Sequence, residues 1–102
     1  MLVDTGATFS VIPETLARAV GINRLKRRVV MTLADRRQVR VDAGTAIFRI
    51  GGREAPATIL IGGVVEPILG VETLEALGLT VDSRRRRLTP SRSYAVRLGG
   101  YR

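Results

Sequence analysis

Asp4 is the residue whose type and surroundings best suit catalytic chemistry in this sequence. It begins the turn-forming stretch Asp4-Thr5-Gly6-Ala7, directly after the apolar pair Leu2-Val3. Two carboxyl groups that share one proton can activate a water molecule and protonate a leaving nitrogen, because like charges about 3 Å apart cannot both ionise. A glycine lets two such turns approach closely, and a Thr hydroxyl can hydrogen-bond across to the partner turn. The plainer interpretation of Asp4 is an Asx turn that begins a helix.

The composition excludes the other common catalytic centres. The chain contains no His and no Cys, which removes Ser-His and Cys-His pairs, thiolate chemistry and the commonest metal ligand. We therefore expect no metal and no cofactor. No apolar run approaches the roughly 20 residues that a membrane span needs, so we expect no membrane partner. The absence of Cys fits a reducing compartment, and we expect the cytoplasm.

The net charge of +8 is concentrated near the C-terminal end of the chain. Residues 84–102 contain seven Arg and no acid, whereas residues 1–83 contain ten basic and nine acidic side chains. A solvated turn is the plainer interpretation of the run Arg84–Arg87, and a contact with nucleic acid or another anion is the alternative. Only Tyr94 and Tyr101 could stack on bases there, so we do not expect nucleic acid as a partner.

The elements that must position this carboxyl group are mostly short strands joined by turns. Glu14–Val20 combines helix formers with apolar residues, and Gly21 predicts where that helix ends. Val29–Leu33 and Gln38–Asp42 predict the strands of a hairpin whose tip is Ala34-Asp35-Arg36-Arg37. Further along, apolar runs alternate with glycines, which predicts strands at Thr45–Ile50, Ala55–Ile61, Pro67–Leu69, Leu79–Asp82 and Arg87–Thr89 and a helix at Val71–Leu77. We therefore predict a mainly β, antiparallel, barrel-like domain with two short helices.

One stretch of the chain occurs twice. Glu14-Thr15-Leu16 recurs as Glu72-Thr73-Leu74, and each copy leads to a helix stop at a glycine. An apolar pair and a glycine precede each copy, Leu2-Val3 with Gly6 in the first case. The pattern predicts two copies of a strand, a glycine turn and a helix, although a coincidence of common residues is the alternative. Only the first copy carries an acid before its glycine.

These motifs resemble the retropepsins, the retroviral-type aspartic proteases, and their bacterial and eukaryotic relatives. Leu2–Thr8 is similar to the catalytic loop of that family, and Pro67–Leu74 is similar to its apolar-apolar-Gly motif with the helix that follows. The hairpin over residues 29–42 lies where the flap is expected. The resemblance implies a single-lobe acid-protease β-barrel over residues 1–89, followed by a basic tail over residues 90–102.

The resemblance also implies a function and a site. It implies an aspartic endopeptidase that acts on peptide or protein substrates, with Asp4, Thr5 and Gly6 as its catalytic loop. Substrate contacts are expected from Ala7, Ala34, Asp35, Arg36 and Ile68. Because the chain has one Asp-Thr-Gly and is too short for a second lobe, the second carboxylate must come from another copy of the chain, which makes the enzyme a homodimer.

Two features depart from the family pattern. Family members carry a strand and a hairpin before the catalytic loop, so we expect either that the sequence is a fragment or that the first barrel strand and part of the dimer seam are missing here. We expect Ser93–Leu98 to form a strand in the vacant position. The flap tip is charged instead of Gly-rich. The alternative function is a catalytically inactive dimerisation or binding module with the same fold.

Overall fold

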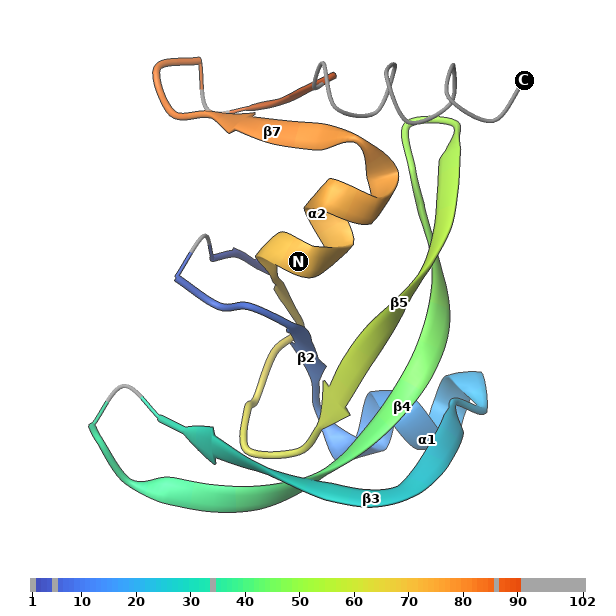
Figure 1. Cartoon of the computed structure of the whole chain (residues 1–102), viewed down its shortest axis with the longest axis vertical. Helices are drawn as coiled ribbons and strands as arrows, with labels where there is room; N and C mark the ends of the chain where they lie inside the picture. Colours follow the sequence, from blue (N-terminus) through green and yellow to red (C-terminus); the bar gives the residue numbers. More distant parts are fainter. Residues whose placement is uncertain (1, 5, 34, 86, 91–102) are drawn as a thin grey trace.

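The computed structural model describes residues 2–4, 6–33, 35–85 and 87–90. Within these residues the chain forms eight strands and two helices, arranged as Figure 1 shows. In chain order they are β1 (Leu2–Val3), β2 (Ser10–Ile12), α1 (Glu14–Val20), β3 (Asn23–Thr32), β4 (Gln38–Ile50), β5 (Arg53–Ile61), β6 (Ile68–Leu69), α2 (Val71–Leu77), β7 (Leu79–Asp82) and β8 (Arg87–Pro90).

The strands form one large sheet and one small sheet. The large sheet has six strands in the order β1-β6-β2-β5-β4-β3, and β7 pairs with β8 in a separate two-stranded sheet. The mainly β class is therefore confirmed, but the large sheet stays open among the described residues and does not close into a barrel. Two pairings, β1 with β6 and β2 with β5, are parallel. These two pairings differ from the antiparallel arrangement that the sequence predicts. Tight turns report only on strands that are neighbours in sequence, and the parallel pairs join strands that are not.

Several predicted element bounds are wrong. Ser10–Ile12, for which the sequence predicts no strand, forms β2, and all three of its residues are buried. β4 is one continuous strand of 13 residues, not two strands separated near position 44. Ala43 and Gly44 are buried inside it and pair with Leu60 and Ile59 on β5. Ala43 and Gly44 separate the two strands predicted from the sequence, but in the structure they continue the pairing of β4 with β5.

The core consists of three groups of buried apolar side chains. α1 contributes Ala17 to a group with Ile12, Ile59 and Ile61. α2 contributes to a second group, which comprises Leu69, Leu74, Leu77 and Leu79. The third group lies beneath the β3–β4 hairpin and comprises Val11, Val41, Ala43 and Leu60. Each helix therefore covers its own part of the sheet, and the third group supports the hairpin.

The repeated Glu-Thr-Leu stretches mark two similar units. α1 and α2 each have seven residues and each end at a glycine, Gly21 or Gly78, with φ 70°. The strands directly before them are β2 and β6, and these pair antiparallel at Val11 and Ile68. The repeated unit is thus a strand and a helix, and the strand of the first copy is β2, not the predicted Leu2-Val3.

An ion-pair network at the surface joins α1 to the long hairpin. The guanidinium of Arg24 on β3 binds the carboxylates of Glu14 on α1 and of Asp42 on β4, the latter at 2.7 Å. The hydrogen bond from Arg24 holds the pKa of the Glu14 carboxyl below its usual range and raises the pKa of Arg24. The network helps to fix the base of the β3–β4 hairpin on the body of the domain.

The predicted tail strand at Ser93–Leu98 lies outside the described residues, so that strand and the domain boundary after residue 89 stay predictions. Among the described residues, no helix is both long and apolar enough to cross a membrane.

Candidate active site

Backbone hydrogen bonds hold the loop that follows β1. The Asp4 N–H donates to the Leu69 carbonyl at 3.0 Å, and the Ala7 N–H donates to the Asp4 carbonyl at 3.1 Å. Asp4 Oδ1 accepts the Gly6 N–H at 2.9 Å, which is the geometry of an Asx turn. The turn leads into strand β2, however, and not into a helix. Asp4 is exposed to solvent, and these hydrogen bonds hold the turn that carries it.

The far end of this loop caps α2. The N–H groups of Val71 and Glu72 donate to the carbonyls of Ala7 and Thr8, both at 2.8 Å. The first N–H groups of a helix have no partner inside the helix, so these bonds satisfy two of them. Backbone hydrogen bonds therefore join both ends of the loop to the second repeated unit, one end to β6 and the other to α2.

A buried pair of hydroxyl groups lies behind the loop. Ser10 Oγ and Thr73 Oγ1 are 2.6 Å apart, and Ser10 Oγ also accepts the Gly70 N–H at 3.0 Å. Both side chains are fully buried. A buried polar network whose members are all satisfied fixes a unique arrangement. Sequence reasoning missed this pair, because the two residues are far apart in the chain and neither belongs to a polar cluster.

Gly70 lies directly against the backbone of Phe9 and Ser10. A Cβ atom on Gly70 would lie 2.4 Å from the carbonyl carbon of Phe9 and 2.8 Å from the backbone nitrogen of Ser10. Its φ of −98° is open to any residue, so the lack of space is what requires glycine. The glycine of the apolar-apolar-Gly motif therefore lets the chain after β6 contact the backbone that follows the loop.

We expect Gly70→Ala to destabilise the fold by about 3 kcal/mol or more, because the backbone that its methyl group would meet cannot move away easily. Gly21→Ala is the matched control. Position 21 has open space but a φ of 70°, which costs a residue with a side chain about 1–2 kcal/mol. Urea unfolding followed by circular dichroism measures both values. Equal stability of the two variants would contradict the steric explanation.

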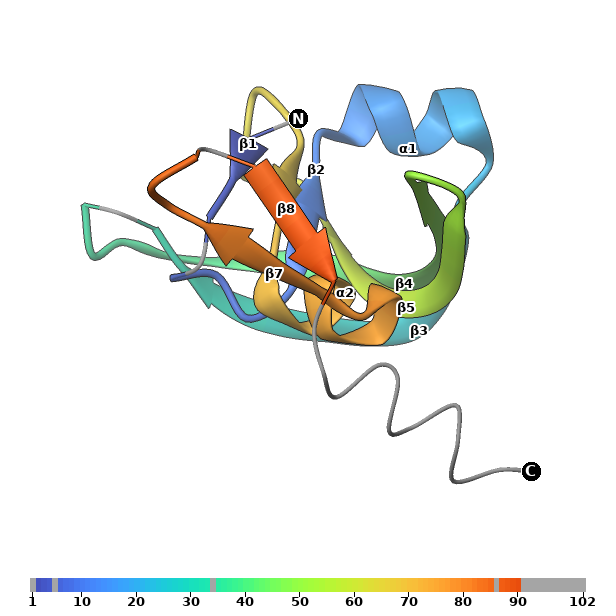
Figure 2. The ribbon, with the colours of Figure 1, turned by 90° about the horizontal axis from the view of Figure 1, so that it is seen from above.

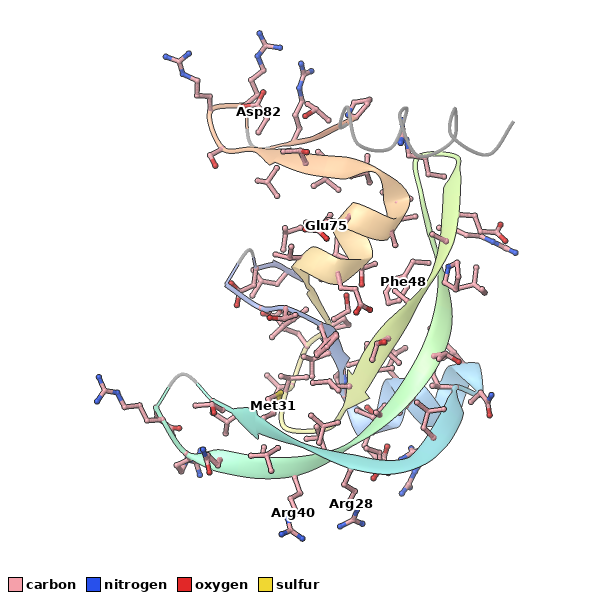
Figure 3. The ribbon with its side chains drawn as sticks, viewed as in Figure 1. Arg28, Met31, Arg40, Phe48, Glu75 and Asp82 are labelled. Carbon is pink, nitrogen blue, oxygen red and sulfur yellow. The ribbon has the colours of Figure 1, made fainter. Side chains whose placement is uncertain are left out.

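A cleft opens between this loop and the β3–β4 hairpin. Its volume is about 790 Å³. Figure 3 shows Met31 pointing from β3 toward the body of the domain, whereas Arg28 and Arg40 point away from it. Sixteen of the described residues line the cleft: Asp4, Gly6, Ala7, Thr8, Phe9, Val11, Val29, Val30, Met31, Thr32, Leu33, Asp35, Leu60, Gly63, Val64 and Ile68. Most of these side chains are apolar, and among the described residues no Lys or Arg lines the cleft.

The hairpin turns tightly at its tip. The Leu33 N–H donates to the Arg37 carbonyl at 2.8 Å, and the Arg36 N–H donates to the Leu33 carbonyl at 2.9 Å. The Asp35 carboxylate accepts the Arg37 N–H at 3.1 Å and Arg37 Nε at 2.6 Å. Arg36 has a positive φ of 68°, which costs a non-glycine residue free energy. The predicted turn at residues 34–37 is confirmed for the residues that the structure describes.

The cleft brings together most of the predicted site residues. Asp4, Gly6, Ala7, Asp35 and Ile68 all line it, although they come from three separate parts of the chain. Arg36 lies at the hairpin tip but does not line the cleft, and Thr5 and Ala34 lie outside the described residues.

Sequence reasoning missed a further wall of the cleft, the segment that contains Gly63 and Val64. In the sequence, Gly62-Gly63 indicates only where the predicted strand Ala55–Ile61 ends. The available signal was the apolar pair Val64-Val65, which follows those glycines in the sequence.

Asp4 and Asp35 are the two carboxylates that line the cleft, and their surroundings differ. Both oxygens of Asp35 accept hydrogen bonds from Arg37. At Asp4, Oδ1 accepts one backbone N–H, and within the described part of the chain Oδ2 accepts no hydrogen bond. Asp4 can therefore offer a carboxylate oxygen to a water molecule in the cleft. Among the described residues, no group of three or more acids could hold a metal ion.

A comparison with protein families gives a match over most of the chain. The family model described as gag-polyprotein putative aspartyl protease matches residues 1–76. The matched stretch includes the loop after β1, the whole β3–β4 hairpin and Ile68 of the cleft. No curated protein matches the chain.

Proposed function

Because the chain belongs to the retropepsin-like family of aspartyl proteases, we propose that it is an endopeptidase that hydrolyses peptide bonds with two copies of Asp4. The observation that carries this proposal is the exposed Asp4 carboxylate at a cleft of about 790 Å³ that is otherwise mostly apolar. A peptide in extended conformation would lie between the loop after β1 and the β3–β4 hairpin. Ala7, Asp35 and Ile68 would contact it, and roles for Thr5 and Ala34 stay predictions.

The chemistry needs one ionised and one protonated carboxyl group. The ionised carboxylate takes a proton from a bound water, and the water oxygen attacks the carbonyl carbon of the scissile bond. The protonated carboxyl supplies the proton that the leaving nitrogen takes up as the C–N bond breaks. Two adjacent carboxyls are held in these unequal states because like charges so close cannot both ionise. No covalent bond forms between enzyme and substrate.

A second copy of Asp4 is the best source of the second carboxyl. Asp35 lines the same cleft, but Arg37 binds both of its oxygens. Asp42 pairs with Arg24, and Asp82 accepts N–H groups of its own turn. The loop after β1 is exposed, so two copies can meet at a twofold axis with Asp4 facing Asp4. The active enzyme would then be a homodimer.

The proposal is tested by incubating the purified protein with a mixed peptide library between acidic and neutral pH. New peptide termini, identified by mass spectrometry, report cleavage. We expect activity to rise and then fall as the pH increases, because one carboxyl must be protonated while the other is ionised. A transition-state-mimicking inhibitor of aspartic proteases should abolish it. Absence of cleavage at every pH, from a protein shown to be folded, would instead favour an inactive binding module.

A further inference from the structure

A run of four arginines, residues 84–87, follows β7 and ends at the first residue of β8. Residues 83–87 have the sequence Ser-Arg-Arg-Arg-Arg, and we call the three arginines among them that the structure describes, Arg84, Arg85 and Arg87, the Arg turn. The carboxylate of Asp82 accepts the N–H groups of Arg84 at 3.1 Å and of Arg85 at 3.2 Å. An Asp that binds the backbone two and three residues ahead of it fixes a turn. Arg84 and Arg85 therefore extend from a defined turn, and Arg87 begins β8.

The guanidinium groups of the Arg turn are available to a partner. Arg84, Arg85 and Arg87 are exposed. Arg85 Nε lies 3.9 Å from Asp82 Oδ2, and its side chain is 68% exposed. Among the described residues, neither Arg84 nor Arg87 forms an ion pair through its side chain. By contrast, five described arginines outside the turn are paired with acids: Arg18, Arg24, Arg28, Arg37 and Arg49. Planar guanidinium groups of this kind favour carboxylates and phosphates.

The Arg turn lies on the same side of the molecule as the cleft. In Figure 1 the connection after β7, the loop after β1 and the tip of the β3–β4 hairpin all lie at the left. Figure 2, turned by 90° about the horizontal axis, keeps all three at the left. The loop that carries Asp4 lies between the hairpin tip and the Arg turn in Figure 1. A chain that leaves the cleft can therefore reach the Arg turn.

The cleft and the Arg turn differ in the side chains that they favour. Asp4 and Asp35 line the cleft together with apolar residues, so an acidic substrate side chain would be repelled there. The Arg turn would attract an acidic side chain that lies elsewhere on the substrate, outside the cleft. We propose that the Arg turn is an exosite that binds an acidic segment of a protein substrate while apolar residues of the same substrate occupy the cleft. This inference rests on the proposed function.

Two matched peptides test the exosite. Both carry one cleavage site found in the library, and one has a flank of four Glu where the other has four Gln. At low salt we expect kcat/KM to be roughly tenfold higher for the Glu peptide, since exposed charge pairs each contribute modestly. The difference should lie in KM and not in kcat, and it should vanish in about 0.5 M salt, where screening is strong.

Substitution of Arg84, Arg85 and Arg87 by Gln should remove the preference for the Glu peptide and leave cleavage of the Gln peptide unchanged. The matched control replaces Arg18, Arg28 and Arg40 by Gln, which removes the same charge from other surfaces; Arg28 and Arg40 point away from the body of the domain (Figure 3). Reversal of the three turn arginines to Glu should create a preference for a Lys-flanked peptide. An unchanged preference in the first variant, or an equal loss in the control, would overturn the exosite.

A binding measurement separates this inference from the proposed function. Fluorescence anisotropy of the labelled Glu peptide is measured on the same variants, without any need for cleavage. If the protein cleaves nothing, the endopeptidase proposal fails, and a loss of binding confined to the turn variant still supports the acidic-segment site. A single-stranded oligonucleotide that binds the turn and displaces the Glu peptide at lower concentration would identify nucleic acid as the ligand and overturn the exosite.

Discussion

Replacement of Asp4 by Asn should lower the rate of peptide cleavage by about a thousandfold or more, because an amide can neither accept nor supply the proton that the reaction needs. The change is nearly isosteric. Asn can keep the bond in which Oδ1 at position 4 accepts the Gly6 N–H, which is 2.9 Å long in the native chain. Because the side chain is exposed, the free energy of unfolding should change by less than about 0.5 kcal/mol. Initial rates of peptide cleavage measure the effect on activity, and urea unfolding measures the effect on stability.

Asp35→Asn is the control for this variant, since it removes the other carboxylate of the same cleft. Arg37 already binds both oxygens of Asp35, so Asp35 takes no part in proton transfer in our mechanism. We therefore expect the Asp35→Asn variant to lose far less activity than the Asp4→Asn variant. The mechanism would be wrong if Asp4→Asn kept full activity. It would also be wrong if both variants lost activity equally while remaining folded.

Activity should also depend on assembly. If each site needs Asp4 from two chains, specific activity should fall when the protein is diluted through its dimer dissociation constant. The chain itself offers no substitute for the second copy, because the repeated unit at Ile68–Gly70 has no acid. Analytical ultracentrifugation gives the dissociation constant, and rates are measured above and below it. Constant specific activity far below that concentration would show that a single chain is sufficient.

The elements that sequence alone predicted well are those with local signals. α1 and α2 have the predicted bounds, Glu14–Val20 and Val71–Leu77, because helix formers precede a glycine at the end of each. The hairpins around residues 34–37 and at Gly51-Gly52 were likewise predicted, since turn residues separate apolar runs. In these segments, the physical cause of the structure lies within a few residues of chain.

Other elements depend on contacts between distant segments. Ser10–Ile12 forms a strand because β5 and β6 lie on either side of it, and nothing in its own three residues requires this. The parallel pairing of β1 with β6 brings Leu2 next to Ile68. Such pairings depend on the whole topology, which turn signals do not report.

The candidate site shows the same division. The carboxylate at Asp4 and the neighbouring Ala7 could be identified from the Asp-Thr-Gly motif. Ile68 could be identified from the apolar-apolar-Gly motif. The Ser10 and Thr73 hydroxyl pair and the wall at Gly63 could not, because these residues matter through packing across the fold. The resemblance to a family thus pointed to candidate residues, and the structure was needed to show what surrounds them.

A mixing experiment tests most directly whether two Asp4 carboxylates form one active site. Wild-type and Asp4→Asn chains are dissociated together, reassociated in varied proportions at constant total concentration and assayed for peptide cleavage. Mixed dimers carry one carboxylate, so activity should follow the square of the wild-type fraction, with about a quarter of full activity in an equal mixture. Mixtures with an inert protein control for dilution. Activity that falls only in proportion to the wild-type fraction, from chains shown to have exchanged partners, would contradict a site shared between two copies.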